Sequence, residues 1–264
     1  MKSERIPVKS FSADNGFIGK MQKLVREEVL PYQYNILNDA IPGIEKSHAI
    51  ENIRLAAEKL RGKDVKPDEF YGMVFQDSDV AKWIEAAAYA LAAGEDPELE
   101  KAVDETIQLY GASQHEDGYV DSYFTVKCPD KMWTNICDAH ELYCAGHMME
   151  AAVAYYEVTG KRELLDIMSK SADCIYEQFM KKNTRAYPGH PEVELALMRL
   201  WRATGNEKYK ELAKHFVDVR GQAPNYFVEE KKNRGWNVWD GTEELNTDYT
   251  QSTLPVREQK DAVG

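Results

Sequence analysis

The chain has 264 residues, of which 33 are lysine or arginine and 45 are aspartate or glutamate, so its formal net charge is −12. With 43% hydrophobic and 11% aromatic residues it can bury a substantial core, which excludes general disorder. Its length suits one large domain or two small ones. Nucleic acid and anionic membranes are disfavoured as partners, because binding them requires a basic face.

The N-terminal stretch MKSERIPVKSFSADNG lacks the apolar segment of a signal peptide. No run in the chain approaches the roughly 18 apolar residues of a membrane-spanning helix. Four cysteines are too few for a disulfide scaffold in a chain of this length, and none forms a CxxC pair. We therefore expect a cytoplasmic protein with reduced thiols.

The first recognisable unit is a helical hairpin. From Val80 to Leu91, apolar residues recur at the i, i+3, i+4 spacing of an amphipathic helix. The segment GEDP interrupts this pattern, which resumes from Leu99 to Tyr110. Pro97 suits the first turn of the second helix, where its missing N–H costs nothing. The pattern predicts two helices joined by a tight turn.

Two further hairpins follow. Helices predicted at 141–158 and 192–203 end at Thr159-Gly160 and Thr204-Gly205, and a second apolar-periodic segment follows each turn. Glycine is the residue that most readily adopts the left-handed conformation after a helix. The segments TGKRELLDI and TGNEKYKEL are visibly related, so the sequence predicts an imperfect repeat of helical hairpins. We expect less than about a tenth strand, placed in residues 6–19 or in the loops.

The connections between hairpins are long and rich in aromatic residues. They span about 114–135, 180–191 and 221–251. If the hairpins stack side by side, every tight turn lies at one end and every long loop at the other. Long ordered loops gathered at one end of a scaffold are where function is expected. The alternative is that they only cap the core.

Polar residues begin the first helix of each hairpin, at the same loop-rich end. They are Asp77 and Asp79, His140, and His190. Helix capping alone explains either aspartate. His190, however, lies in the stiff segment YPGHP, which favours a role in a pocket. We predict that His140 and His190 face one concavity with an aspartate and a loop aromatic residue (Tyr123, Trp133 or Tyr187).

A metal site is a weaker hypothesis. His140, Cys144 and His147 share a helical face, but HELYC lacks the second histidine of the HExxH protease motif. We favour the alternative that Cys144 is a small core residue and the histidines line a pocket. The phosphate-binding patterns GxGxxG and GxxxxGK[ST] and the hydrolase pattern GxSxG are absent.

Several segments together resemble glycoside hydrolase family 127, the β-L-arabinofuranosidase-like enzymes. These segments are FYGMVFQDSDVAKWIEA, EDGYVDSYFTV, WTNICDAHELYCAGHMMEAAVAYYEVTGKRELLDI, YPGHPEVELAL and LPVREQKDAVG. The resemblance runs in the family's order from about Phe11 to the last residue. It implies an all-α fold, with residues 1–264 as one partial (α/α)6 barrel domain whose first 20 residues are irregular or form short strands.

The same resemblance implies a carbohydrate substrate, namely β-L-arabinofuranosides or related plant-type glycans. It also implies a binding role for histidines in the HELYC and YPGH segments, here His140 and His190. The expected substrate-binding set is His140, His190, Asp77, Asp79, Tyr187 and Trp133. Family members are considerably longer, and their acid/base glutamate, cysteine nucleophile and zinc cluster lie beyond the segment matched here. The resemblance therefore implies a retaining glycosidase of which this chain supplies the N-terminal, sugar-binding part, with no metal ligands and no catalytic residue assigned. We expect the flank of the incomplete barrel to be apolar and available for association.

Two other functions compete with this hypothesis. One is a helical-repeat scaffold that binds a partner without catalysis, although such adapters keep the loops short at both ends. The other is a different toroid enzyme on carbohydrates, such as a lyase or an epimerase. The long aromatic loops favour an enzyme-like site over the scaffold.

Overall fold

The computed structural model describes residues 6–11, 13, 16–182, 184–239, 245 and 250–260, and within these residues the chain is helical with no strand. The α-helices are α1 (Phe17–Leu24), α2 (Leu30–Leu37), α3 (Ala49–Leu60), α4 (Asp77–Ala93), α5 (Pro97–Ala112), α6 (Ser122–Lys127), α7 (Glu141–Thr159), α8 (Glu163–Tyr176), α9 (Val193–Thr204), α10 (Glu207–Val219) and α11 (Tyr226–Asn233). Short 3-10 turns (η1, Val8–Ser10; η3, Pro67–Glu69; η4, Pro129–Lys131; η6, Val256–Glu258) and π-turns (η2, Val25–Val29; η5, Glu177–Lys181) complete the described elements.

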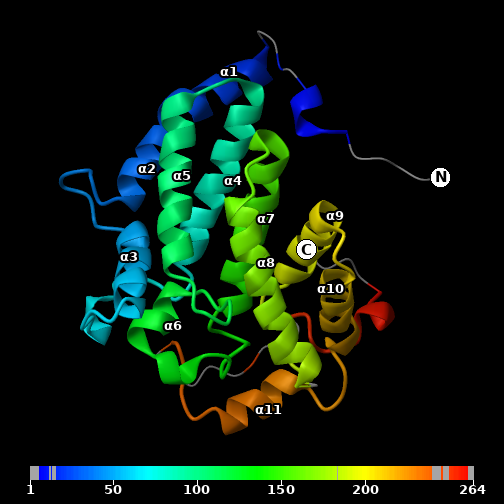
Figure 1. The fold of residues 1–264 in the computed structure, drawn as a ribbon. Helices are drawn as coiled ribbons and strands as arrows, with labels where there is room; N and C mark the ends of the chain where they lie inside the picture. The colour runs from blue at the N-terminus through cyan, green and yellow to red at the C-terminus, as the bar shows by residue number, and fades with distance from the viewer. Residues whose placement is uncertain are drawn as a thin grey trace.

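The three predicted hairpins are confirmed as α4/α5, α7/α8 and α9/α10 (Figure 1). Asp96 caps α5 by accepting a hydrogen bond from the Leu99 N–H at 3.1 Å, and Pro97 is the first residue of that helix. Gly160 and Gly205 end α7 and α9 in the left-handed region, with φ of 78° and 73°. Local turn chemistry therefore determines where each hairpin reverses.

The hairpins stack in two layers. The first helices α4, α7 and α9 pack side by side, and the second helices α5, α8 and α10 lie against them on one side. Figure 1 shows the tight turns at the upper end and the long loops, with α6 and α11, at the lower end. The N-termini of α4, α7 and α9 therefore meet at the loop-rich end, as the sequence predicts.

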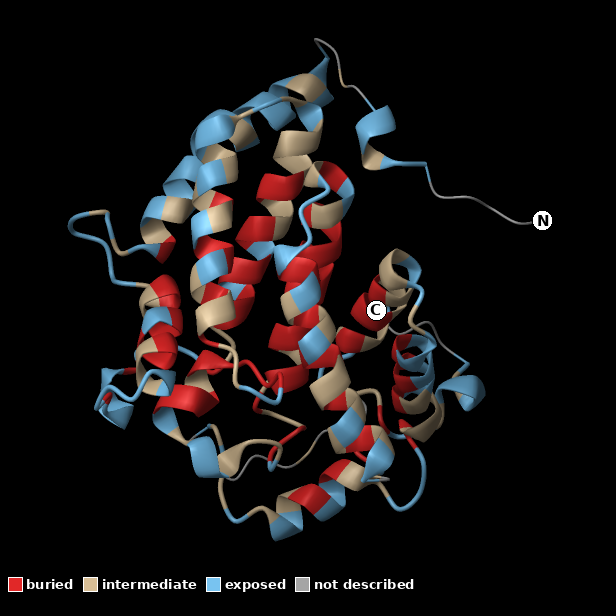
Figure 2. Ribbon diagram, viewed as in Figure 1, coloured by how far each residue is buried: buried red, intermediate tan, exposed pale blue. Residues whose placement is uncertain are grey.

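The core is centred on α7, which is buried along most of its length (Figure 2). Small and flexible side chains such as Ala151, Ala154 and Met148 let α4 and α9 approach α7 closely. Trp83 of α4 is buried as well, and its indole N–H donates to the Leu30 carbonyl at 3.1 Å. This packing fixes the positions of the three helix N-termini relative to one another.

The N-terminal region differs from the expectation of irregular structure or short strands. In its described part, η1 is a 3-10 turn and α1 begins at Phe17. Met21 and Val25 line a cavity together with Ala86 and Ala90 of α4, and both residues remain 39% exposed. Residues 1–5, 12, 14 and 15 lie outside the described residues.

Two further surface features bear on the expectations. Among the described residues, none of the helices combines the length and apolar character that crossing a membrane requires.

On the last hairpin, Leu195 of α9 is 59% exposed and Val217 of α10 is 38% exposed. Association through an apolar flank stays a prediction.

Candidate functional site

Three histidines and a tyrosine gather where α7 and α9 begin. His140 immediately precedes α7, Tyr143 and His147 follow one and two turns later, and His190 lies in the loop before α9. The His140 and His190 rings have centroids 6.1 Å apart, and the Tyr143 ring is 5.4 Å from His140 and 4.9 Å from His190. His147 stacks edge-on to Tyr143 at 4.5 Å. We call these four residues the histidine cluster.

Aromatic and charged residues from other elements border the cluster. Phe75, just before α4, lies 5.2 Å from the His140 ring and 6.3 Å from the Trp239 ring. Lys82 of α4 donates to the Tyr143 hydroxyl at 3.0 Å. The Nδ1 of His147 lies 3.5 Å from a carboxyl oxygen of Glu192. The site thus combines apolar ring faces with hydrogen-bonding groups.

The electrostatics keep the imidazoles neutral. Desolvation lowers the pKa of His140, and it lowers the pKa of His147 to about 4 with help from the positive charge of Lys82. Desolvation also lowers the pKa of His190, together with Arg220 and Lys82. Burial raises the pKa of Glu192 to about 7, with contributions from the nearby carboxylates Glu150 and Glu85. At neutral pH each ring therefore offers one donor and one acceptor.

His140 has a defined orientation. Its backbone adopts the left-handed conformation with φ of 61°, which turns the chain into α7. Its Nδ1 lies 2.5 Å from the Asp138 carbonyl oxygen, so Nδ1–H is the donor there. In the neutral ring Nε2 is then an acceptor, and the hydrogen bond made by Nδ1–H fixes this tautomer.

The loop that carries His190 is held from two sides. The Gly189 N–H donates to the Ile136 carbonyl at 3.2 Å, and a Cβ on Gly189 would lie 1.8 Å from the Cys137 carbonyl oxygen. On the other side the buried guanidinium of Arg220 donates to the Pro188 carbonyl at 2.6 Å. Only glycine permits the first contact, so this residue sets the separation of the two histidine loops.

Of the other predicted site residues, the structure brings none into ring contact with the cluster in its described part. Asp77 is buried, and its carboxylate accepts hydrogen bonds from the Ser122 N–H at 2.8 Å and from the Ser122 hydroxyl. Asp79 is exposed on α4, one turn before Lys82. Asp77 thus links α4 to α6, and its burial raises the pKa of its carboxyl.

The loop aromatic residues pack into the core. Trp133 makes edge contacts with the Tyr119 and Phe179 rings at 5.0 and 5.5 Å. Tyr187 is buried beside Phe227, with ring centroids 4.4 Å apart. Large aromatic rings gain most by burial, which explains why these two line the core beneath the loops. Tyr123 packs against Phe70 at 5.2 Å, away from the histidines.

The residues present do not fit a zinc ion. Cys144 is buried, and burial raises the pKa of its thiol well above the ordinary value, which disfavours the thiolate that zinc requires. Tyr143 and His147 occupy the accessible side of α7 instead. Among the described residues no group of three or more His, Cys, Asp or Glu side chains is arranged to hold a metal ion. Cys144 is a core residue, as the sequence favours.

Sequence reasoning missed several members of this site. The sequence predicts His147 among the pocket-lining histidines but does not single out Tyr143. Tyr143 follows His140 by three residues and precedes His147 by four, a helical signal that could have identified it. Lys82 lies one turn after Asp79 and could have been found in the same way. Phe75 and Trp239 have no such signal, because Phe75 meets His140, and Trp239 meets Phe75, only in the folded chain.

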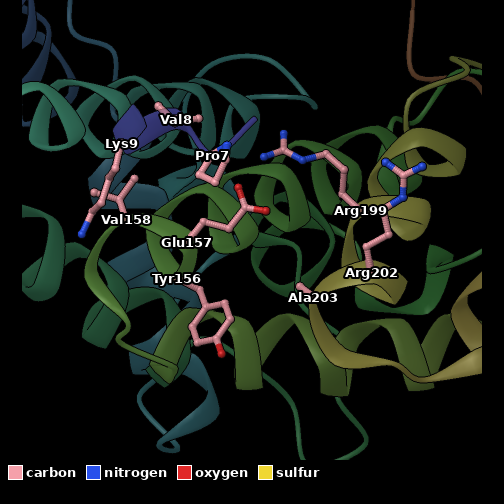
Figure 3. A pocket seen from close by; sticks show the side chains of 9 residues that line it. All are labelled: Pro7, Val8, Lys9, Tyr156, Glu157, Val158, Arg199, Arg202 and Ala203. Carbon is pink, nitrogen blue, oxygen red and sulfur yellow. The ribbon is translucent and has the colours of Figure 1, made fainter. Parts of the chain in front are cut away.

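A cavity of about 410 Å³ lies at the opposite end of the first helices, between η1 and the C-terminal parts of α7 and α9 (Figure 3). Arg199 and Arg202 line it beside Glu157. The charge of Arg199 is already compensated by ion pairs with Glu150 and with Glu85, the latter at 3.2 Å. The histidine cluster is therefore the stronger candidate site.

Comparison with known proteins relates this chain to carbohydrate-active enzymes. Residues 12–264 match the family model of the β-L-arabinofuranosidase GH127 catalytic domain. A non-reducing end β-L-arabinofuranosidase from Bifidobacterium longum subsp. longum is 39% identical, over 90% of this chain and 38% of that protein. The crystal structure of a GH127 β-L-arabinofuranosidase from Geobacillus stearothermophilus T6 is 51% identical with a TM-score of 0.85, covering 94% of this chain and 38% of that one.

A solved GH127 β-arabinofuranosidase is 30% identical with a TM-score of 0.79, covering 98% of this chain and 37% of that one. The chain thus spans less than two fifths of the length of these relatives. Its helical hairpins superpose on theirs, which confirms the expected all-α toroid architecture. Because the family model matches nearly all of its length, this chain belongs to glycoside hydrolase family 127.

Proposed function

We propose that this chain supplies the sugar-binding wall of a retaining glycoside hydrolase that acts on β-L-arabinofuranosides. The observation that carries the proposal is the histidine cluster, in which His140 and His190 lie 6.1 Å apart with Tyr143 beside both. Membership of GH127 and the names of the relatives support the substrate class.

The chemistry of the cluster suits a neutral polyhydroxylated ligand. Each sugar hydroxyl both donates and accepts a hydrogen bond, and a neutral imidazole can meet both needs through its two nitrogens. The lowered pKa values of His140 and His147 keep these rings neutral under ordinary conditions. The ring faces of Phe75 and Tyr143 offer apolar area of the kind that a sugar's C–H groups cover.

In this proposal the chain's own residues bind and orient the sugar and do not cleave it. The resemblance to the family implies that the nucleophile and the general acid lie outside the matched segment, and the buried Cys144 offers no accessible thiolate. We accordingly expect weak binding of the sugar by the chain alone and no turnover.

The test is to measure the binding of 4-nitrophenyl β-L-arabinofuranoside to the 264-residue chain by saturation-transfer NMR and calorimetry. We expect the double variant His140→Ala/His190→Ala to bind at least about tenfold more weakly, because two neutral hydrogen-bonding groups are worth about 1.4 kcal/mol or more together. The matched control is His215→Ala, which removes a half-buried histidine from α10. The α-anomer of the glycoside serves as the specificity control.

Unchanged binding in the double variant would contradict the proposed wall. Hydrolysis by the wild-type chain that disappears in the double variant would contradict the division of labour, because it would place catalytic groups here. We also propose a cytoplasmic location, supported by four cysteines that all remain free thiols. Fractionation of the source cells tests that location.

A further inference from the structure

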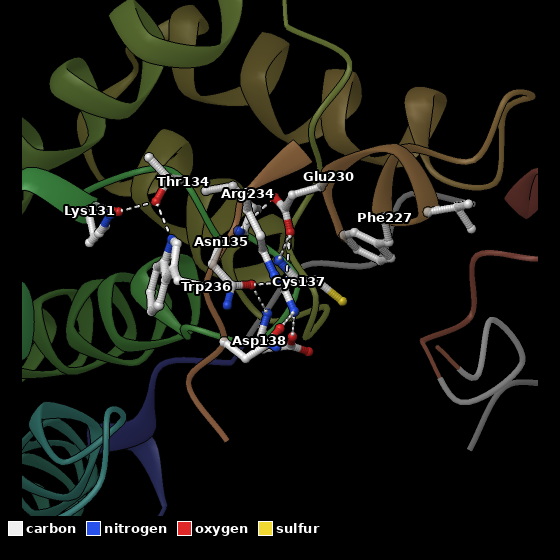
Figure 4. Close-up of polar contacts among 12 residues, drawn as sticks. Lys131, Thr134, Asn135, Cys137, Asp138, Phe227, Glu230, Arg234 and Trp236 are labelled. Atoms are coloured by element: carbon white, nitrogen blue, oxygen red, sulfur yellow. Dashed lines mark hydrogen bonds and ion pairs between the residues drawn. The ribbon is translucent and has the colours of Figure 1, made fainter. Parts of the chain in front are cut away.

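The loop before α7 is fastened to α11 by one buried guanidinium (Figure 4). Arg234 follows α11 directly, and its side chain is only 3% exposed. One terminal nitrogen donates to Asp138 Oδ2 at 2.6 Å and to Asn237 Oδ1 at 2.7 Å. The other donates to Asn135 Oδ1 and lies 3.3 Å from a Glu230 carboxyl oxygen. The planar fork thus holds both ends of the turn at residues 135–138.

Glu230, one turn earlier on α11, holds the middle of the same turn. Its carboxyl oxygens accept hydrogen bonds from the Ile136 N–H at 2.8 Å and the Cys137 N–H at 3.1 Å. Figure 4 shows Glu230 and Arg234 on one side of the turn, converging on it from α11. We call this pair the α11 clamp.

The clamped turn touches both histidine loops. Its Asp138 carbonyl accepts the Nδ1–H of His140. Its Ile136 carbonyl accepts the Gly189 N–H, one residue before His190, at 3.2 Å. A displacement of residues 135–138 therefore changes the orientation of one ring and the distance to the other.

We propose that Arg234 and Glu230 are positioning residues for the candidate sugar site. The clamp keeps the Asp138 carbonyl on His140 Nδ1–H, so that Nε2 faces the cluster as an obligate acceptor for a sugar hydroxyl. It also fixes the separation of His140 and His190 through Gly189. The role in sugar binding rests on the proposed function, whereas the control of the His140 tautomer does not.

Lysine cannot replace arginine here. A guanidinium presents donors from two nitrogens in a fixed plane, whereas an ammonium is a point charge that cannot hold Asn135, Asp138 and Glu230 in one geometry. Arg234→Lys therefore retains the positive charge between two carboxylates but loses the fork. Arg234→Lys is the informative variant, because it keeps the neutralisation of the carboxylates and removes only the precise positioning of the turn.

The experiment measures tautomers by long-range ¹H–¹⁵N NMR of the ¹⁵N-histidine-labelled chain at pH 7.5. We expect wild-type His140 as the Nδ1–H form and, in Arg234→Lys, a substantial population of the Nε2–H form. His215 is the internal reference, because its Nε2–H donates to the Thr184 carbonyl at 3.1 Å and should keep the opposite tautomer in both proteins. Affinity for 4-nitrophenyl β-L-arabinofuranoside should fall about tenfold or more in Arg234→Lys. The exposed Glu229→Gln on the same helix is the matched control and should change neither readout.

The outcomes separate the two proposals. A folded Arg234→Lys that keeps the wild-type His140 tautomer and affinity overturns the positioning role. If Arg234→Lys does not fold, Glu230→Gln loosens the same turn from its other support, and an unchanged tautomer there overturns the role equally. If the wild-type chain binds no arabinofuranoside but the tautomer shifts in the variants, the clamp stands and the proposed function fails.

Discussion

Glu141 provides the sharpest test of the electrostatics, because its carboxyl is buried in the first turn of α7. It accepts hydrogen bonds from the Tyr119 hydroxyl at 2.7 Å and from the Trp133 backbone N–H at 3.1 Å. Burial raises the pKa of Glu141 to about 8, although these hydrogen bonds oppose the shift by favouring the charged form.

The sign of the pH dependence follows from that value. A carboxyl with a higher pKa in the folded than in the unfolded chain retains its proton longer in the folded chain. Its contribution to stability is complete below the unfolded pKa, near 4.5, and is lost as the pH rises through about 8. The loss amounts to about 4–5 kcal/mol at ~1.36 kcal/mol per pK unit, as an upper limit.

The variant Glu141→Gln should remove this loss, because an amide of the same shape stays neutral and its oxygen can still accept from Tyr119. We expect the variant and the wild type to have similar free energies of unfolding at pH 5. At pH 9 the variant should be the more stable by a few kcal/mol, within the limit set by the pKa of Glu141. Urea unfolding followed by circular dichroism at constant ionic strength measures both.

The control is Glu229→Gln, which changes an exposed carboxylate on α11 and should leave the pH dependence of the wild type unaltered. Parallel stability curves for Glu141→Gln and the wild type between pH 5 and 9 would refute the reasoning. That result would mean that the carboxyl is charged in the folded chain, or that water reaches it.

Three further predictions concern the site and its scaffold. Gly189→Ala should cost at least about 2 kcal/mol of stability in urea unfolding, because its Cβ would lie 1.8 Å from the Cys137 carbonyl oxygen and overpacking forces the backbone apart; a neutral effect would show that the two loops separate freely. His147 should titrate near pH 4 in ¹H NMR, since desolvation lowers its pKa, and a midpoint above 6 would contradict its placement. Asn206→Ala should destabilise the chain by about 1 kcal/mol, because it removes the side-chain oxygen that caps α10 by accepting from the Lys208 N–H at 3.2 Å. Equal thermal unfolding midpoints for the variant and the wild type, measured by circular dichroism, would argue against that cap.

The sequence alone determined the hairpins and their directions. Helix boundaries at Pro97, Gly160 and Gly205 depend on local backbone preferences, which act the same way in any surroundings. Stacking of like hairpins then places the starts of all first helices at one end. For this reason His140, which precedes α7, and His190, which lies in the loop before α9, could be predicted to lie together.

Only the tertiary structure decided which neighbours share the site. Asp77 and Asp79 are both acidic residues in the first turn of α4. Yet Asp77 is buried against Ser122, 45 residues away, while Asp79 faces solvent. Likewise, Tyr143 rather than Cys144 meets the histidines, because α4 covers the other side of α7.

The α11 clamp shows the same limit at longer range. Arg234 meets Asp138 across 96 residues of sequence, and no periodicity or motif connects them. From the sequence alone, an arginine after a polar helix is expected to be a solvated surface charge. It becomes a buried fork only because the loops fold over it and leave carboxyl and amide oxygens that need donors. Local preferences therefore determine the scaffold, whereas desolvation and long-range hydrogen bonding determine the orientation of the groups that it presents.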